Sequence, residues 1–284
     1  MRVAIVVHRE RPLALELAAH TVDWLAAHAG AAVLLTDDAE RIGRPAAGVA
    51  TTADLTRGTD VCLSLGGDGT MLRAVDVASA DGVPVVGVNC GQMGYLTEVE
   101  PADLDVALDR LLVGDYAVDE RMMLAVHVES AGPAAGDWIA LNETVVEKPR
   151  TGHTARLEVA INGRPFTTYA ADGLVVATPT GSTAYSFSAR GPIVSPRLRC
   201  VLLTPVSPHM LFDRALVLDA DEELSVTVNG ELGATMTVDG RELGDLDPGD
   251  RVVCTASDTV ARMISFAPRD FHQILKAKFG LADR

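Results

Sequence analysis

The sequence predicts an α/β N-terminal domain with a parallel sheet, followed by a β-rich C-terminal domain. Over the first 118 residues, continuous apolar runs of strand length alternate with segments of helical period, which is typical of a parallel sheet covered on both faces. After about residue 119, apolar residues recur at every second position, as in antiparallel strands. The chain has 284 residues, a length that suits two domains better than one core.

The elements expected in the first domain follow from this alternation. Apolar runs predict strands over 2–7, 31–36, 60–65 and 83–89. Apolar residues at helical spacing predict helices over 15–29, 70–79 and 102–114. Gly30 and Gly114 stand at the ends of two of these helices, where glycine commonly stops a helix.

The second domain is expected to consist of hairpins and short strands. Alternating apolar residues predict strands over 122–128, 157–161, 173–178, 200–204, 223–228, 234–238, 251–256 and 261–266. "NG" at 162–163 and "DG" at 239–240 predict tight hairpin turns. A lone helix near the end of the chain carries apolar residues on one side. We therefore expect a domain over 1–118, on which 268–284 packs back, and a domain over 119–267.

The charge of the chain limits the partners that it can have. Acidic residues outnumber basic ones by 39 to 24, which gives a formal net charge of -15. Such a surface repels nucleic acid and anionic membranes, so neither is expected as a partner. A phosphate-bearing ligand must then be held by local backbone amides and a few placed cations, which favours a small molecule.

The cysteines and the hydropathy pattern indicate a cytoplasmic protein. Four cysteines are scattered along the chain without metal-ligand spacing, which favours buried thiols in a reducing compartment over disulfides or zinc. The longest apolar runs are of strand length, well short of the roughly 20 residues that a membrane helix needs. The N-terminus lacks the features of a signal peptide.

The stretch "SLGGDGT" (64–70) places three glycines around Asp68, where a strand ends and a helix begins. Open α/β sheets bind ligands at such loops. Gly66, Gly67 and Gly69 can take positive φ and carry no Cβ, so backbone N–H groups can close on phosphate oxygens. A carboxylate beside phosphate is unfavourable unless it binds a metal, orders a hydroxyl or accepts a proton. A plain turn is the alternative, and neither of the two commonest phosphate-loop motifs is present.

Two further polar patches carry candidate binding residues. "ATPTGSTAYSFSARGP" (177–192) is dense in hydroxyl groups, which suit sugar and amide recognition. An ordinary helix N-cap by Ser182 or Thr183 is the alternative. "LNETVVEK" (141–148) sets Asn142 and Glu143 in a β-prone run, where the alternative is the solvent face of a strand.

These pieces together resemble the NAD kinase family. "GGDGT" (66–70) matches the signature that this family shares with the wider phosphofructokinase and diacylglycerol kinase superfamily. "NE" at 142–143 and "DGLVVATPTGSTAYSFS" (172–188) are more specific, and "VNCGQMGYLTEV" (88–99) and "LLTPVSPHMLFDRALVL" (202–218) match in order. The resemblance covers nearly the whole chain and implies an NAD kinase-like fold.

The resemblance implies transfer of a phosphoryl group from ATP, or in some members polyphosphate, to the adenosine 2′-hydroxyl of NAD, which yields NADP. It implies that Asp68 acts on that hydroxyl, in agreement with the positioning role of a carboxylate in phosphoryl transfer. Thr70 or Arg73 would add a hydroxyl and a cation, although Arg73 could equally be a solvated helix arginine. Mg²⁺ or another divalent cation is expected with the donor, and no protein ligand set for it can be recognised in the sequence.

The resemblance also assigns residues to the dinucleotide. Asn142 and Glu143 would hold ribose hydroxyls, Asp172 the nicotinamide end, and Tyr95 would pack against adenine. The pocket for adenine and its ribose would be formed by Thr183, Ala184, Tyr185 and Ser188, and Ser186 would be a further nucleotide-binding residue.

Three positions relate to variation within the family. A small residue two positions before Asp172, here Ala170, accompanies use of NADH as well as NAD, so dual acceptor use is a hypothesis. His153 lies where relatives carry a varied polar or basic residue near the donor side, and a solvated bystander is the alternative. Arg190 replaces the first of two glycines before a proline. If that glycine is needed for positive φ or close approach, Arg190 should distort the loop or partly fill a phosphate site; at the rim it would add a cation.

Other functions and the assembly stay open at this stage. A lipid or sugar kinase of the same superfamily would also fit "GGDGT", but the acidic charge opposes approach to anionic bilayers. A nucleotide-sensing module without turnover is a second alternative. Relatives self-associate through the β-rich part, so the resemblance implies a homodimer or homotetramer.

Overall fold

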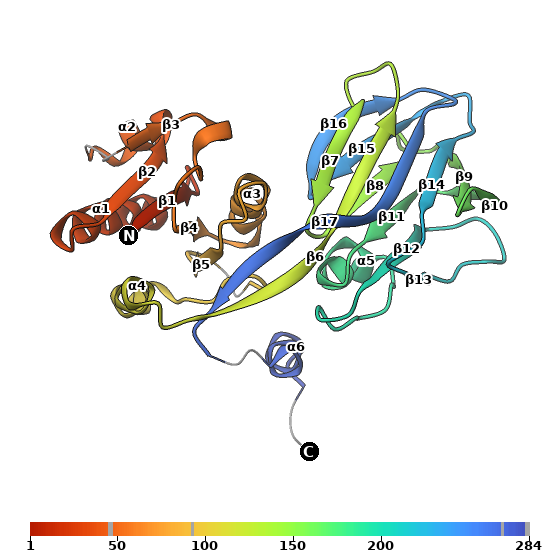
Figure 1. Cartoon of the computed structure of the whole chain (residues 1–284). Coiled ribbons are helices and arrows are strands. Elements are labelled where there is room, and N and C mark those ends of the chain that lie inside the picture. Colours follow the sequence, from red (N-terminus) through yellow and green to blue (C-terminus); the bar gives the residue numbers. More distant parts are fainter. Residues whose placement is uncertain (45–47, 92–93, 268–269, 282–284) are drawn as a thin grey trace. The chain divides into compact units, whose positions relative to one another are not determined.

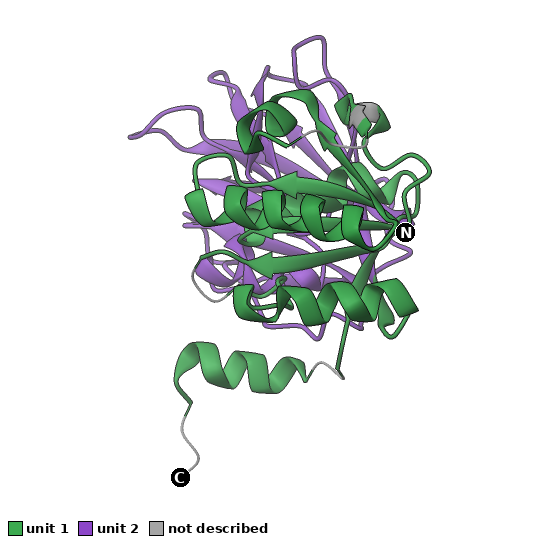
Figure 2. Cartoon of the chain, turned by 90° about the vertical axis from the view of Figure 1, so that its left-hand side faces the viewer, with its two compact units in different colours: residues 1–120, 260–284 green, residues 121–259 purple. Residues whose placement is uncertain are grey.

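The structure is a computed structural model that describes residues 1–44, 48–91, 94–267 and 270–281 (Figure 1). The chain divides into unit 1, residues 1–120 with 260–284, and unit 2, residues 121–259 (Figure 2). Positions 92–93 of the matched stretch 88–99, and positions 268–269 and 282–284 of the expected C-terminal segment, lie outside the described residues.

A parallel sheet forms the centre of unit 1. Its strands are β1 (Arg2–Val7), β2 (Ala31–Leu35), β3 (Gly48–Ala50), β4 (Val61–Gly66) and β5 (Val85–Asn89). They lie in the order β3-β2-β1-β4-β5, and every neighbouring pair is parallel. Their continuous apolar runs are buried almost throughout, as expected of strands covered on both faces. The predicted α/β fold class is confirmed.

Helices cover both faces of this sheet. They are α1 (Pro12–Ala27), α2 (Thr36–Ile42), α3 (Asp68–Ser79) and α4 (Leu104–Val113), with short 3₁₀ turns η1 (Thr52–Asp54) and η2 (Pro101–Asp103). Unit 1 also contains α6 (Phe271–Phe279), in which no residue is buried. Ile5 and alternate residues of the neighbouring strands pack in one cluster with α1 and α4. Met71 of α3 packs at Gly87, whose strand neighbours belong to that cluster, so α3 lies on the opposite face.

The end of α1 differs from the prediction that Gly30 stops it. The helix ends at Ala27, and Ala29 takes the positive φ, at 54°. A Cβ at position 30 would lie 2.9 Å from Leu25 Cδ2 and 3.1 Å from the Met1 carbonyl oxygen. Gly30 is thus placed for close packing, and not for a left-handed conformation.

Unit 2 is rich in β-structure, as predicted. A six-stranded antiparallel sheet has the order β13 (Leu216–Asp219), β12 (Cys200–Val206), β11 (Gly173–Ala177), β8 (Glu143–Glu147), β15 (Ala234–Val238), β16 (Arg241–Leu246). A second set of strands comprises β10 (Arg164–Ala171), β9 (Ala155–Ile161), β14 (Leu224–Val228), β17 (Arg251–Ser265), β6 (Ala117–Glu129) and β7 (Gly136–Ala140). Apolar residues of both sets, such as Leu157, Leu174 and Val226, share one buried core.

Both predicted hairpin turns are confirmed. Asn162 and Gly163 have φ of 51° and 71°, and Asp239 and Gly240 have φ of 48° and 75°. Positive φ at both central residues is the geometry of a type I′ turn, which matches the twist of the flanking strands.

The prediction of two separate strands over 251–256 and 261–266 is wrong. One strand of 15 residues, β17, spans both. The polar residues 257–259 that interrupt the apolar pattern lie where the chain passes from unit 2 to unit 1, at residues 259 and 260. Within the described ranges, no helix has the length and apolar character to span a membrane.

Candidate functional site

The loop that carries Asp68 lies at a topological switch point of the unit 1 sheet. From β1 the chain proceeds to β2 and β3 on one side, whereas β4 and β5 lie on the other. The helices that follow β1 and β4 therefore lie on opposite faces, which leaves a crevice at the carboxyl ends of these strands. Gly66 ends β4, Gly67 connects the two elements and Asp68 begins α3, so the structure places all three where such sheets bind ligands.

The carboxylate of Asp68 is held by two backbone amides. The N–H of Tyr95 donates to Oδ2 at 2.8 Å, and the N–H of Leu96 donates to Oδ1 at 3.0 Å. This loop comes so close that a Cβ on Gly94 would overlap Asp68 Oδ1. Each carboxylate oxygen keeps further acceptor capacity, so Asp68 can still accept a hydrogen bond from a hydroxyl group.

Gly66, Gly67 and Gly69 can take positive φ, but none of them does so, and what matters is the missing Cβ. Gly66 lacks a Cβ because the side chain of Thr70 occupies that space, and Thr70 itself is buried. A Cβ at Gly67 or Gly69 would meet no atom of the described residues within 4 Å. These two positions therefore border open space in which a ligand can approach the backbone.

Arg73 and Tyr95, two further predicted residues of unit 1, differ in their position relative to Asp68. Arg73 is exposed on α3 and follows Asp68 by five residues, which turns it about 140° around the helix from the carboxylate. Tyr95 is partly buried, and the Lys278 ammonium lies 3.3 Å from its ring centroid. Burial, and then the charge of Asp68, raise the pKa of Tyr95.

Asp239 holds the backbone of Asn142 and Glu143 in unit 2. From the sequence, Asp239 was predicted only as part of a hairpin turn. The carboxylate of Asp239 accepts the backbone N–H groups of Leu141, Asn142 and Glu143 at 2.7, 2.8 and 3.1 Å. A Cβ on Gly181 would overlap the Asn142 carbonyl. The turn before β8 is therefore held from two sides by segments distant in sequence.

Glu143 is a buried carboxyl group with an unusual protonation state. Its side chain belongs to a residue that is 8% exposed, and within the described part of the chain Oε2 is buried without a hydrogen-bond partner. Burial raises the pKa of Glu143 to about 8, with a further rise from the charge of Asp239, while the backbone N–H of Tyr185 lowers it. The carboxyl is therefore mostly neutral at pH 7 and can donate a hydrogen bond.

Several hydroxyl groups in the segment after β11 form hydrogen bonds within the protein. Its short helices are η3 (Thr180–Thr183) and α5 (Tyr185–Ser188). The Ser182 hydroxyl bonds both polar backbone groups of Val194, and Ser186 bonds Thr204 at 2.9 Å. Both serines are fully buried, so Ser186 faces the interior and not a ligand, contrary to its assignment as a binding residue.

The helix N-cap offered as the alternative is not formed by Ser182 or Thr183. Neither η3 nor α5 has a side-chain cap, and Thr178 accepts the N–H of Gly181 instead, at 3.1 Å. Of the remaining predicted residues here, Thr183, Ala184 and Tyr185 are partly buried and Ser188 is exposed.

An ion pair accompanies Asp172. The Lys148 ammonium lies 2.7 Å from Asp172 Oδ1, and both side chains are partly exposed. Burial raises the pKa of Tyr185, and the charges of Glu147 and Asp172 add to the rise, so these groups lie near one another. Lys148 was not among the residues predicted from the sequence, although its position in the same segment as "NE" was a signal. Ala170 is partly buried on β10, and its carbonyl accepts the His209 N–H at 2.7 Å.

Arg190 takes the backbone conformation that a glycine would favour. Its φ is 68°, and its N–H donates to the Phe187 carbonyl at 3.0 Å while that of Gly191 donates to Ser186 at 2.8 Å. This is the Schellman motif at the end of α5. A Cβ on Gly191 would lie 2.8 Å from the Ser186 carbonyl oxygen, so close approach falls to Gly191. Arg190 is exposed, and the expected distortion of the loop is not seen.

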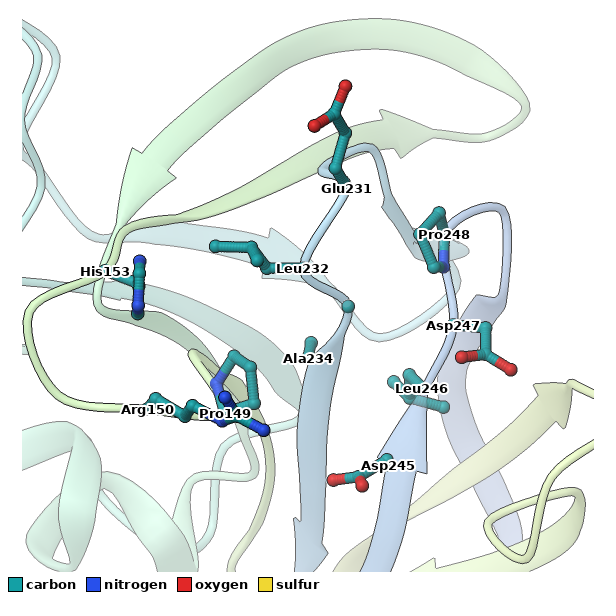
Figure 3. Close-up of a pocket in the computed structure, with 11 residues that line it drawn as sticks. Pro149, Arg150, His153, Glu231, Leu232, Ala234, Asp245, Leu246, Asp247 and Pro248 are labelled. Atoms are coloured by element: carbon teal, nitrogen blue, oxygen red, sulfur yellow. The ribbon is translucent and has the colours of Figure 1, made fainter.

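His153 lies apart from this cluster, in a cavity of about 390 Å³ in unit 2 (Figure 3). None of the other predicted binding residues is among its described lining residues, which are Pro149, Arg150, His153, Glu231, Leu232, Gly233, Ala234, Asp245, Leu246, Asp247 and Pro248. The structure does not bring His153 together with Glu143, Asp172 or Tyr185.

The cysteines are free, buried thiols, as predicted. Burial raises the pKa of Cys62 and Cys254 to about 12, so neither is a reactive thiolate. Over the residues that the structure describes, no three His, Cys, Asp or Glu side chains gather in a metal-binding group.

The chain matches family models and curated proteins along its length. The ATP-NAD kinase N-terminal domain matches residues 3–116, and the ATP-NAD kinase C-terminal domain matches residues 141–266. The NAD kinase of Heliobacterium modesticaldum is 42% identical over 278 residues, which cover 97% of this chain and 97% of that protein. The NAD kinase of Moorella thermoacetica is 40% identical over 98% of this chain and 88% of that protein.

Two solved structures share the fold. Yeast NADH kinase complexed with NADH has a TM-score of 0.90 at 24% identity, covering 100% of this chain and 89% of that one. An NAD kinase from Archaeoglobus fulgidus in complex with ATP has a TM-score of 0.77 at 24% identity, covering 100% of both chains. With two family models and full-length relatives in agreement, the chain belongs to the NAD kinase family.

Proposed function

We propose that this protein transfers the terminal phosphoryl group of ATP to the adenosine 2′-hydroxyl of NAD, with NADP and ADP as products. One observation carries the proposal beyond family membership. At the switch point of the unit 1 sheet, a carboxylate held by two backbone amides stands next to two glycines that border open space. Phosphoryl transfer needs this combination, because the protein mainly positions the attacking oxygen and the phosphates.

In this mechanism Asp68 orients the 2′-hydroxyl and takes its proton as the oxygen attacks phosphorus. A positioned base contributes roughly 10²- to 10⁴-fold to the rate. The open backbone at Gly67 and Gly69 gives the phosphates of the donor room beside the carboxylate. Mg²⁺ enters with ATP as the metal–nucleotide complex and offsets part of the phosphate charge.

Asn142 and Glu143 hold ribose hydroxyls of the dinucleotide. The buried Oε2 of Glu143 has no hydrogen-bond partner among the residues that the structure describes, which supports this role, since a ligand hydroxyl could supply the partner. As a neutral carboxyl, Glu143 adds no negative charge next to the diphosphate of NAD. The three hydrogen bonds from backbone N–H groups to the Asp239 carboxylate keep the turn in place while the ligand exchanges.

The acceptor pocket takes NADH as well as NAD. Oxidised nicotinamide is a cation, and an isolated Asp172 would favour it over the neutral reduced ring. The Lys148 ammonium, 2.7 Å from Asp172, offsets that preference. The small side chain of Ala170 also favours use of both redox forms. We therefore expect the rates with NAD and with NADH to agree within about tenfold.

The test is product formation by the purified protein with Mg²⁺. ATP and polyphosphate are offered as donors, each with NAD, NADH, diacylglycerol or fructose 6-phosphate, and products are identified by mass and by ³¹P NMR. We expect a 2′-phosphate on the dinucleotide, with ATP as the better donor. Phosphorylation of the lipid or the sugar in its place would overturn the proposal. NAD binding without turnover, with either donor, would assign the protein a sensing role.

We further propose that the protein is a homodimer or homotetramer, on the resemblance to the family. Light scattering of the purified chain, at 29.9 kDa per protomer, tests this. A monomer at assay concentration would contradict it.

A further inference from the structure

Asp68 needs a cation nearby if a phosphoryl group is to react beside it. The carboxylate and the transferred group are both negative, and like charges at close range oppose the approach of the donor. Phosphoryl-transfer enzymes meet this with metal ions and with lysine or arginine side chains. Arg73, the cation expected from the sequence, is exposed and points away around α3.

The structure brings a different cation to this place. Lys278, on α6 of unit 1, lies with its ammonium 3.3 Å from the centroid of the Tyr95 ring. The backbone N–H of the same Tyr95 donates to Asp68 Oδ2 at 2.8 Å. Tyr95 thus contacts the Asp68 carboxylate through its backbone N–H and the Lys278 ammonium through its ring. Lys278 is also electrostatically coupled to Asp68, whose charge raises the pKa of the lysine against the larger lowering by burial.

The helix that carries Lys278 is defined at both ends. Asp270 caps its N-terminus by accepting the N–H groups of His272 and Gln273 at 2.9 and 3.3 Å. Gly280, with φ of 58°, ends it. Lys278 lies in the last turn, where the helix dipole favours a positive charge. The two caps therefore define a regular helix that carries Lys278 in its last turn.

We infer that Lys278 is a catalytic residue of the proposed reaction, whose ammonium binds the transferred phosphoryl group beside Asp68. The contact of an ammonium with an aromatic ring is weak, so Lys278 can exchange the ring for a phosphoryl oxygen once the donor is bound. It then offsets the charge that develops during transfer, while Asp68 takes the proton of the 2′-hydroxyl. The inference rests on the proposed function, because it needs a phosphoryl group at Asp68.

The test compares Lys278→Met with Lys278→Arg and with Lys276→Met, which removes one positive charge from the same helix. Rates are measured with ATP, Mg²⁺ and NAD, and NAD affinity is measured separately without donor. We expect kcat of Lys278→Met to fall about 10²- to 10³-fold, the loss typical of one removed charge-stabilising donor. Its Kd for NAD should change less than about threefold, and Lys278→Arg should restore part of kcat. Lys276→Met should stay within about threefold of wild type.

Several results would overturn the inference. Wild-type kcat in Lys278→Met would remove the lysine from the reaction, and a tenfold or greater gain in NAD affinity or rate would mean that Lys278 obstructs Tyr95. Equal losses in Lys278→Met and Lys278→Arg, with lowered thermal stability in both, would assign a purely structural role. In each case wild-type NADP formation would leave the proposed function intact. Absence of NADP from the wild type would defeat both.

Discussion

The glycine-rich loops of the two units look alike in sequence and differ in what their glycines face. In unit 1, a Cβ at Gly67 or Gly69 would enter open space. In unit 2, a Cβ at Gly181 or Gly191 would collide with the backbone of Asn142 or Ser186. The first loop leaves room for a ligand, and the second lets chain segments approach one another. A glycine-rich loop is thus evidence for a ligand only when its missing side chains face unoccupied space.

Asp68 of unit 1 and Glu143 of unit 2 both carry carboxyl groups, but their surroundings differ. Asp68 is partly exposed and held by two amides. Glu143 is buried, next to the negative charge of Asp239, with its pKa raised to about 8. The partly exposed environment of Asp68 suits a base. The buried environment of Glu143 suits a neutral carboxyl group that binds a hydroxyl.

The largest effect is expected from Asp68→Asn. The amide keeps the size of the side chain and loses the base, so kcat should fall about 10²- to 10⁴-fold. Steady-state rates give kcat, and calorimetric titration with NAD should give a Kd within about threefold of wild type. A kcat within about threefold of wild type would show that Asp68 is not the base.

The next effect is a pH dependence of stability through Glu143. Its pKa is raised from 4.5 to about 8, so between these values the folded state holds a proton that the unfolded chain has lost. The free energy of unfolding should therefore fall as pH rises through this window. From pH 5 to pH 8 the wild type should lose about 3 kcal/mol more than Glu143→Gln. Urea denaturation at the two pH values measures this, and parallel losses in both proteins would mean that the carboxyl is not protonated.

A matched pair of glycine substitutions tests the open and closed loops directly. Gly181→Ala forces a methyl group against the Asn142 backbone and should lower the free energy of unfolding by about 1–3 kcal/mol. The methyl group of Gly67→Ala would meet no atom in the described part of the chain, so the stability of this variant should stay within about 0.5 kcal/mol of wild type. Its kcat/KM should nevertheless fall at least about tenfold, because the methyl group enters the space for phosphates. Equal stability of the two variants, from thermal unfolding, would erase the distinction between the loops.

The smallest effect is expected at Arg190. A non-glycine residue at positive φ costs about 1–2 kcal/mol, and the greater freedom of unfolded glycine offsets about 0.5–1 kcal/mol. Arg190→Gly should therefore raise the free energy of unfolding by about 0.5–1 kcal/mol, seen as a rise in Tm of about 1–4 °C. A fall in Tm would show that the arginine side chain stabilises the loop by contacts that outweigh the backbone strain.

Local patterns were enough to predict the parallel sheet, both hairpin turns and the position of Asp68. Each depends on residues close in sequence: continuous apolar runs, "NG" and "DG" pairs, and a glycine-rich end of a strand. The single strand β17 was missed because three polar residues interrupt its pattern where the chain passes between units.

The rest of the site depends on contacts between distant residues. Asp239 fixes the turn at 141–143 from almost 100 positions away, and Lys278 reaches Tyr95 from the far end of the chain. Whether a glycine faces a backbone or open space is likewise decided by its neighbours in space. For this reason Gly67 and Gly181 could not be told apart from their sequence contexts.

The central claim is that the Asp68 carboxylate faces the hydroxyl that becomes phosphorylated. A crystal structure of the protein with NAD bound tests it most directly, through the distance from the adenosine 2′-oxygen to the nearer carboxylate oxygen. We predict a distance of about 2.6–3.2 Å, or a contact through one bridging water. A 2′-oxygen beyond reach of Asp68 even through a water would contradict it.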